Sequence, residues 1–143
     1  MTGILWDLDG TLLDTLDDLA DAVNYALDRF GCPRRTREEV RRFVGNGVKR
    51  LIRQAVGNSP VDAEQVLEVF QRYYQANCQV KTKPYDGVVE VLTRLADKYP
   101  MAIVSNKPDI AVKPLCRDYF GADIFALGET EDCPRKPAPD MVY

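Results

Sequence analysis

The sequence predicts an α/β fold whose parallel-sheet core, incomplete in this chain, is interrupted by an inserted helical block. A short apolar run at residues 4–8 leads into a loop rich in Asp and Gly, as at the end of a buried strand. Residues 16–84 carry apolar side chains at helical spacing throughout. From residue 85 onward strand-like and helical patterns alternate, as in a βαβ unit. We therefore expect a core of residues 1–15 and 85–143 around a helical domain of residues 16–84.

Residues 16–84 are expected to form four helices joined by short connections. Thr15 followed by Asp18 predicts a capping box at the start of the first helix, and Thr36 with Glu39 predicts the same for the second. A Gly-Asn-Gly turn at 45–47 separates the second helix from a third, which ends at Gly57. A fourth helix begins near Asp62, with Val66, Val69, Phe70 and Tyr73 on its core-facing side.

The C-terminal segment is expected to return to the sheet. Its pattern predicts a helix from Val88 to Ala96, a buried strand at 101–104, a helix over 109–119 and a short strand at 124–127. Pro114 is expected to bend the second of these helices or to end its first turn. A further helix would begin within residues 136–140. Because this pattern stops early in a helix and the core is small, we expect the chain to be the first part of a longer protein.

Composition excludes several classes of protein. The 143 residues are 45% hydrophobic and 29% charged with a net charge of −3, which is typical of a soluble globular protein. The absence of a basic run argues against nucleic-acid and membrane partners, and no signal peptide precedes the first strand, so we expect a cytoplasmic protein. Without histidine, Ser-His-Asp, Cys-His and His-ligated metal chemistry are excluded. The four cysteines have no CxxC spacing and are expected to be reduced.

The chemistry-bearing residues follow the predicted strands. Asp7 and Asp9 stand at the carboxyl end of the first strand, where α/β sheets bind ligands. One carboxylate can attack phosphorus while the other donates and accepts the proton. Backbone N–H groups of this loop, at Leu8, Gly10 and Thr11, can turn toward an anion, although an Asp-rich turn without function has the same composition.

Polar residues after later strands suit the same chemistry. Ser105 and Asn106 follow the strand at 101–104 and can donate hydrogen bonds to phosphoryl oxygens, while Lys136 can neutralise their charge. Taken singly, each is typical of an ordinary turn or of a solvated surface charge. Their order along the chain and their placement after strands of one sheet favour a shared site.

Three segments together carry a family resemblance. Residues 7–15 read DLDGTLLDT, residues 105–107 read SNK and residues 136–140 read KPAPD. With these motifs the chain resembles the haloacid dehalogenase superfamily, and within it the phosphoglycolate phosphatase branch. The resemblance implies a Rossmann-like parallel-sheet core with a helical cap inserted after the first motif. The family's fourth motif, an acidic metal-binding segment, does not follow residue 140.

The resemblance also implies roles for these residues. Asp7 would be the nucleophile that becomes an aspartyl phosphate, and Asp9 would be the general acid and base. The Asp7 carboxylate and the Asp9 backbone carbonyl would ligate Mg²⁺, while Ser105, Asn106 and Lys136 would hold the phosphoryl group. The implied substrate is a small phosphorylated metabolite such as 2-phosphoglycolate. Another phosphatase of this superfamily, a β-phosphoglucomutase-like enzyme and a non-catalytic fragment remain alternatives, and a homodimer is left open.

The turn between the second and third helices resembles a substrate loop of the cap. Gly45, Asn46 and Gly47 would let the backbone approach the substrate, and Lys49 and Arg50 would meet its carboxylate or a second phosphate. A plain helix–helix turn with solvated charges fits the same residues equally well.

Overall fold

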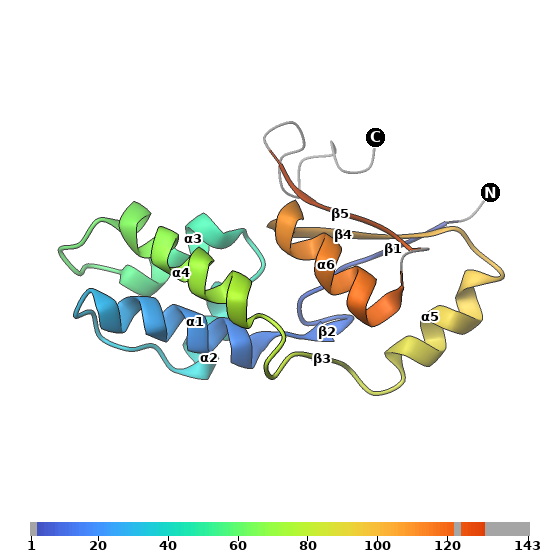
Figure 1. Ribbon diagram of the computed structural model, residues 1–143, viewed down its shortest axis with the longest axis horizontal. Coiled ribbons are helices and arrows are strands. Elements are labelled where there is room, and N and C mark those ends of the chain that lie inside the picture. The colour runs from blue at the N-terminus through green and yellow to red at the C-terminus, as the bar shows by residue number, and fades with distance from the viewer. Residues whose placement is uncertain (1–2, 122–123, 131–143) are drawn as a thin grey trace. The chain divides into compact units, whose positions relative to one another are not determined.

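The computed structural model describes residues 3–121 and 124–130. The chain divides into two compact units (Figure 1). The core unit consists of Met1–Asp14 and Lys83–Tyr143, and the helical unit consists of Thr15–Thr82. An α/β chain with a parallel sheet and an inserted helical segment is therefore confirmed.

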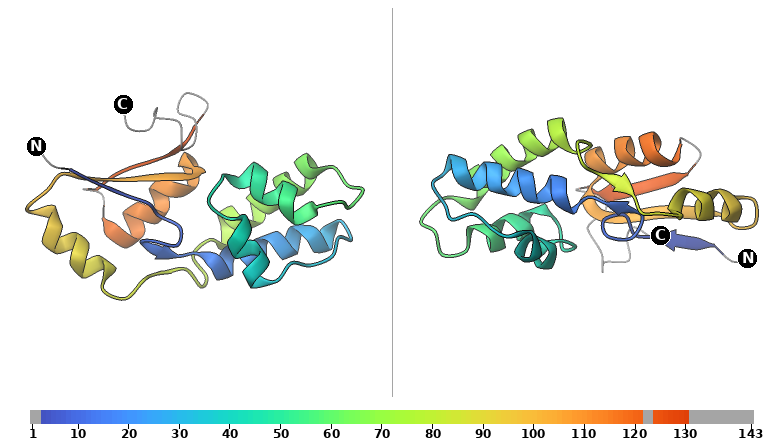
Figure 2. Two further views of the ribbon diagram at one scale, coloured as in Figure 1. Left: turned by 180° about the vertical axis from the view of Figure 1, so that it is seen from behind. Right: turned by 90° about the horizontal axis from the view of Figure 1, so that it is seen from below.

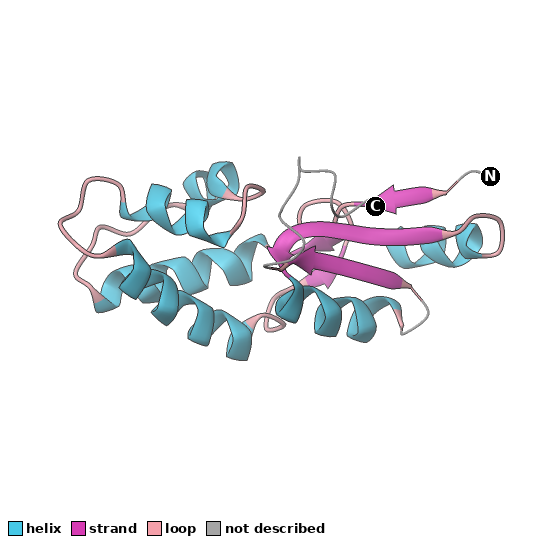
Figure 3. Cartoon of the chain, turned by 90° about the horizontal axis from the view of Figure 1, so that it is seen from above, coloured by secondary structure: helices cyan, strands magenta, loops and turns pink. Residues whose placement is uncertain are grey.

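The core unit is built on a three-stranded parallel sheet. Strands β1 (Ile4–Trp6), β4 (Met101–Pro108) and β5 (Phe125–Glu129) lie side by side in the order β1-β4-β5 (Figure 3). In the register of β1 and β4, Trp6 is level with Ile103. Strand β4 is longer than the predicted 101–104, because it continues through the polar segment up to Pro108 with a register shift after Val104. The carboxyl end of this strand thus carries polar side chains within the sheet itself.

Two helices cover one face of this sheet. Helices α5 (Val88–Ala96) and α6 (Asp109–Phe120) both lie on the same side of the strands in Figure 1, as successive right-handed crossovers require. Leu92 and Leu115 are among the side chains that they bury. Helix α6 continues past Pro114, so this proline does not end its first turn, and the predicted alternative, a bend at Pro114, stays a prediction. Proline leaves the carbonyl of Ile110 without its helical donor, and Ile110 lies at the exposed start of the helix, where water can replace that donor.

A short antiparallel ribbon closes the core unit next to the helical insertion. Strand β2 (Leu13–Asp14) pairs with β3 (Lys83–Pro84), with Leu13 opposite Pro84 and Asp14 opposite Lys83. The prediction that residues 16–84 are entirely helical was therefore wrong at its end. Two residues are too few to show a strand period, and the pairing partner lies far away in the sequence. This ribbon puts the unit boundaries after Asp14 and after Thr82.

The helical unit contains helices α1 (Leu16–Arg29), α2 (Arg37–Phe43), α3 (Val48–Val56) and α4 (Ala63–Asn77) (Figure 2). Their apolar faces form one core in which Phe70 is 1% exposed and Val23, Val40 and Val66 are fully buried. The predicted inner face of α4 is confirmed at Val66 and Phe70, while Val69 and Tyr73 pack against this core from partly buried positions.

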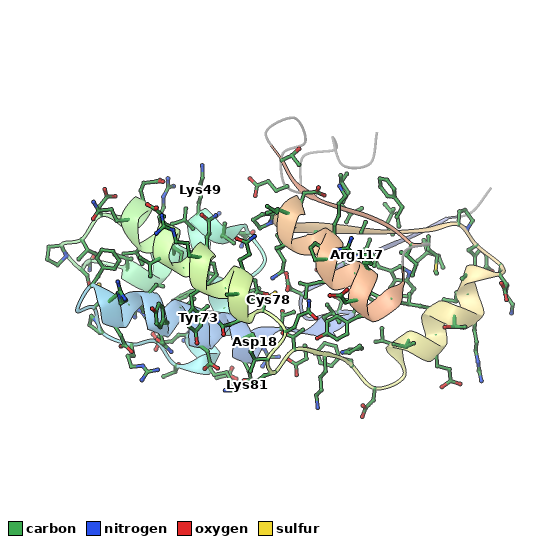
Figure 4. The ribbon with its side chains drawn as sticks, viewed as in Figure 1. Asp18, Lys49, Tyr73, Cys78, Lys81 and Arg117 are labelled. Atoms are coloured by element: carbon green, nitrogen blue, oxygen red, sulfur yellow. The ribbon has the colours of Figure 1, made fainter. Side chains whose placement is uncertain are left out.

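The helix starts agree with the sequence in two cases and differ in one. Thr36 and Glu39 form the predicted capping box, and the Asp62 side chain caps α4. The predicted box at Thr15 and Asp18 was wrong, because the Thr15 side chain makes no capping bond. Asp18 is 3% exposed, and its carboxylate instead accepts hydrogen bonds from the Lys81 and Thr82 backbone N–H groups and from the Thr82 hydroxyl (Figure 4).

Three of the four cysteines, Cys32, Cys78 and Cys116, carry free thiols, as predicted. The fourth, Cys133, lies outside the described residues.

Over residues 3–121 and 124–130, no helix is both long enough and apolar enough to cross a membrane.

Candidate active site

The loop after β1 holds Asp7 and Asp9 in a tight turn. Leu8, between them, is fully buried, and its carbonyl oxygen accepts the N–H groups of Thr11, Leu12 and Leu13 at 3.0–3.2 Å. Gly10 has a φ of 77°, a conformation that glycine adopts without steric strain. The turn is thus anchored by one buried side chain and one carbonyl. It leaves Asp7 exposed and Asp9 partly buried at the end of the strand.

The backbone donors of this loop are engaged within it. The Leu8 N–H donates to Asp7 Oδ1 at 2.9 Å, the Gly10 N–H to the Leu13 carbonyl at 3.0 Å, and the Thr11 N–H to the Leu8 carbonyl at 3.2 Å. Phosphate binding by these three groups stays a prediction. It requires each N–H to exchange its partner within the loop for a phosphoryl oxygen.

The polar end of β4 lies alongside this loop. Because β1 and β4 are parallel and Trp6 is level with Ile103, the residues after β1 run next to the segment 104–107. Ser105 is 1% exposed, and its hydroxyl oxygen accepts the Lys107 N–H at 3.1 Å. Asn106 is partly buried. The sheet therefore brings together the first two sequence motifs, as expected for parallel strands.

One contact joins the two motifs directly. The Lys107 ammonium lies 3.2 Å from Asp9 Oδ1, and the two side chains are only 4% and 14% exposed. Sequence reasoning gave Lys107 no role. The signal that could have identified it is a lysine within an otherwise buried strand segment, since lysine is rarely buried unless it is paired.

Helix α6 contributes a buried thiol near this ion pair. Cys116 is 2% exposed, and burial together with the negative charge of Asp9 raises the pKa of its thiol to about 12. The thiol therefore stays protonated at neutral pH, so a nucleophilic role is excluded.

The raised pKa of Cys116 predicts an alkaline loss of stability. A thiol in an unfolded chain titrates near ~8.5, so above that pH the unfolded chain releases a proton that the folded chain retains up to about pH 12. Stability then falls as pH rises. Between pH 7.5 and 10, urea unfolding should show the wild type losing about 2 kcal/mol more than Cys116→Ala. Equal losses would contradict the assignment.

The turn assigned to the cap lies in the helical unit. Gly45 and Gly47 have φ values of 113° and 87°, and α3 begins directly after them. Asn46 is exposed within the turn, and Lys49 and Arg50 are exposed on the first turn of α3 (Figure 4 labels Lys49). Neither cation forms an ion pair with any other described residue. Their substrate role stays a prediction. Lys136 lies outside the described residues.

A family model described as haloacid dehalogenase-like hydrolase matches residues 4–143, which include both motifs just described. The chain belongs to this family.

Relatives of known name place the chain more closely within the family. It is 43% identical to a phosphoglycolate phosphatase of Pseudomonas savastanoi pv. phaseolicola, over 98% of this chain and 55% of the relative. It is 33% identical to a phosphoglycolate phosphatase of Thiobacillus denitrificans, over 96% of this chain and 63% of the relative. The chain thus spans little more than half the length of the Pseudomonas relative.

Solved structures agree with this placement. A candidate phosphoglycolate phosphatase of Lactobacillus delbrueckii subsp. bulgaricus superposes with a TM-score of 0.89 at 35% identity, covering 98% of this chain and 70% of that one. A predicted phosphoglycolate phosphatase of Haemophilus somnus 129PT gives a TM-score of 0.86 at 30% identity, over 99% and 68%. The likeness extends over both units, so the family fold is shared across nearly the whole chain.

For a haloacid dehalogenase-like chain, the metal implied by the resemblance is Mg²⁺. The described residues contain no cluster of three or more acidic, cysteine or histidine side chains that could enclose an ion. Mg²⁺ does not need such a cluster, because it keeps several waters and binds through one or two carboxylates together with substrate phosphate. The Asp7 carboxylate, exposed at the strand end, and the Asp9 carbonyl are hard oxygen donors that fit this requirement.

Proposed function

We propose that this protein is a Mg²⁺-dependent phosphomonoester hydrolase that acts through an aspartyl-phosphate intermediate. Its proposed substrate is 2-phosphoglycolate or a similar small anionic phosphate. Family membership and the names of relatives at 33% and 43% identity support the reaction class and the substrate.

The observation that carries the proposal is the placement of two carboxylates, one of them paired with a buried lysine, at the carboxyl end of a parallel strand. Asp7 is exposed and accepts the Leu8 N–H, so one carboxylate oxygen has a fixed direction. Asp9 is held two residues away by Lys107. An exposed carboxylate suits attack on an incoming phosphate, and a shielded one suits proton transfer.

The proposed reaction has two steps. An Asp7 carboxylate oxygen forms a bond to phosphorus while the ester P–O bond breaks, and Asp9 gives its proton to the departing alkoxide. Asp9 then accepts a proton from water as the water oxygen attacks phosphorus, and the Asp7–phosphorus bond breaks to release inorganic phosphate. Ser105, Asn106 and Lys136 are proposed to bind the phosphoryl oxygens, whose charge would otherwise oppose attack by a carboxylate.

In this scheme the Asp7 carboxylate and the Asp9 carbonyl would hold Mg²⁺. When bound, Mg²⁺ supplies positive charge that offsets the charge of the transferring phosphoryl group. Lys49 and Arg50 are proposed to meet the substrate carboxylate from the cap, and we infer a cytoplasmic location.

A second candidate is a protein that keeps the family's loops but binds without turnover. The observation that favours this candidate is that the chain spans only 55% of the length of the Pseudomonas relative. Within the enzyme class, a different phosphate substrate or a β-phosphoglucomutase-like transfer are the remaining alternatives.

The decisive experiment measures phosphate released from 2-phosphoglycolate by the 143-residue chain, with and without Mg²⁺, beside an aryl phosphate. Asp7→Asn should abolish turnover, while Asp97→Asn, at the exposed C-terminus of α5, should retain it. Full turnover by Asp7→Asn would overturn the covalent mechanism. An aryl phosphate cleaved equally well would overturn the named substrate. An inactive but folded chain would favour the binding protein.

A further inference from the structure

Lys107 is unusual for its burial. Among the described residues it is the one buried lysine, with an exposed fraction of 6%, and its side chain is 4% exposed. Removing an ammonium from water costs several kcal/mol unless a partner of opposite charge lies close by. Asp9 Oδ1, at 3.2 Å, is such a partner, and it belongs to the loop that carries the proposed nucleophile.

The backbone around Lys107 is constrained on two sides. Its N–H is bound by the Ser105 hydroxyl at 3.1 Å. Its carbonyl oxygen lies so close to Gly128 of β5 that a Cβ added there would sit only 2.5 Å from it. The Gly128 N–H in turn donates to Asp109 Oδ1 at 2.8 Å, which ties β5 to the residue where α6 begins. The ammonium is therefore presented from a rigid strand end.

Asp9 itself lies on a loop rather than in a strand or helix. A side chain on a loop needs outside support to keep a productive orientation, because proton transfer depends on placement within about 0.5 Å. The loop's own bonds fix the backbone from Leu8 to Leu13. The Lys107 ammonium holds the Asp9 side chain itself, through its contact with Oδ1.

We propose that Lys107 is a positioning residue, which holds the Asp9 carboxylate in the orientation needed for proton transfer to and from the substrate. This rests on the proposed phosphatase function. Lys107 touches no reacting atom in this scheme and acts through Asp9. Its loss should therefore lower kcat and leave substrate affinity nearly unchanged.

The test is a double-variant cycle on the 143-residue chain. Lys107→Met keeps the hydrocarbon stem and removes the ammonium, and it is combined with Asp9→Asn. We expect Lys107→Met to lower kcat for 2-phosphoglycolate by about 10- to 100-fold, the scale of a misplaced reacting group, with KM within about threefold. In the Asp9→Asn background the same change should cost less than about twofold, because the group that Lys107 positions is already absent. Lys113→Met, which removes an exposed lysine paired with Asp109 on α6, should leave kcat unchanged.

Two results would overturn the proposal. One is a Lys107→Met variant with kcat within twofold of the wild type. The other is an equal loss of kcat in the wild-type and Asp9→Asn backgrounds, which would indicate a purely structural lysine.

Failure of the proposed function gives a different pattern. If the wild type shows no turnover, the proposed phosphatase activity is wrong, and thermal unfolding of the same four proteins decides about Lys107. Shifts in Tm that are not additive, with the double variant no less stable than the weaker single variant, support positioning of Asp9 by Lys107. Additive shifts overturn it.

Discussion

Asp9→Asn should lower kcat for release of phosphate from 2-phosphoglycolate by roughly 10²- to 10⁴-fold, the range that general acid–base catalysis contributes. An amide has the size of the carboxylate but can neither give a proton to the leaving alkoxide nor take one from water. Asp9 is partly buried, and its Oδ1 lies 3.2 Å from the Lys107 ammonium. Steady-state kinetics with Mg²⁺ measures the effect.

The leaving group provides the control. An aryl phosphate whose phenolate leaves without protonation should lose less activity in Asp9→Asn than 2-phosphoglycolate does, because the acid step is then dispensable. Circular dichroism should show that the variant is folded. A loss below tenfold for 2-phosphoglycolate would assign Asp9 another role.

Asp18→Ala should destabilise the helical unit by about 3 kcal/mol. The carboxylate is 3% exposed and accepts two backbone N–H groups and one hydroxyl from Lys81 and Thr82. Alanine leaves these donors without their acceptor, and each unsatisfied buried donor costs roughly 1–3 kcal/mol. Urea unfolding measures the loss, which corresponds to a fall in Tm on the order of 10 °C.

Asp17→Ala is the matched control. Asp17 precedes Asp18 in the same helical turn, and its side chain is 47% exposed in an ion pair with Arg37. Both variants lose one negative charge near the start of α1, but an exposed pair contributes only about 0–1 kcal/mol. Equal losses in the two variants would show that the buried hydrogen bonds contribute little.

Much of the fold was predictable because its signals are local. The capping box of Thr36 and Glu39 depends on four consecutive residues only. The face of α4 that packs in the core of the helical unit follows from the spacing of Val66 and Phe70. The features that were missed depend on distant partners. Asp18 resembles a helix cap until Lys81 and Thr82 fold back onto it, and β3 exists because Lys83 and Pro84 pair with residues near the N-terminus.

The candidate site follows the same division. Strand order and parallel register place Asp9 near the end of β4, and the sequence predicted this from motifs that follow strands. The length of β4 was not predictable, since Ser105 and Asn106 are typical of turns. The pairing of β4 with β5 shifts register after Val104 and resumes at Pro108, opposite Glu129, which no local pattern in the sequence indicates. The Lys107–Asp9 contact joins residues almost a hundred positions apart, so no local sequence pattern predicts it.

The β2–β3 ribbon makes the helical unit a replaceable module. Asp14 and Lys83 are paired with one another, so the chain leaves the core and returns to it at adjacent points. In terms of strand pairing, the helical unit takes the place of the loop that connects the two strands of a β-hairpin. A two-residue turn could connect β2 and β3 with the same pairing. A segment attached in this way can change its length and its surface without altering a single strand pairing of the core. The fold therefore lets the helical unit, which carries the proposed substrate residues Lys49 and Arg50, vary independently of the core loop that carries Asp7 and Asp9.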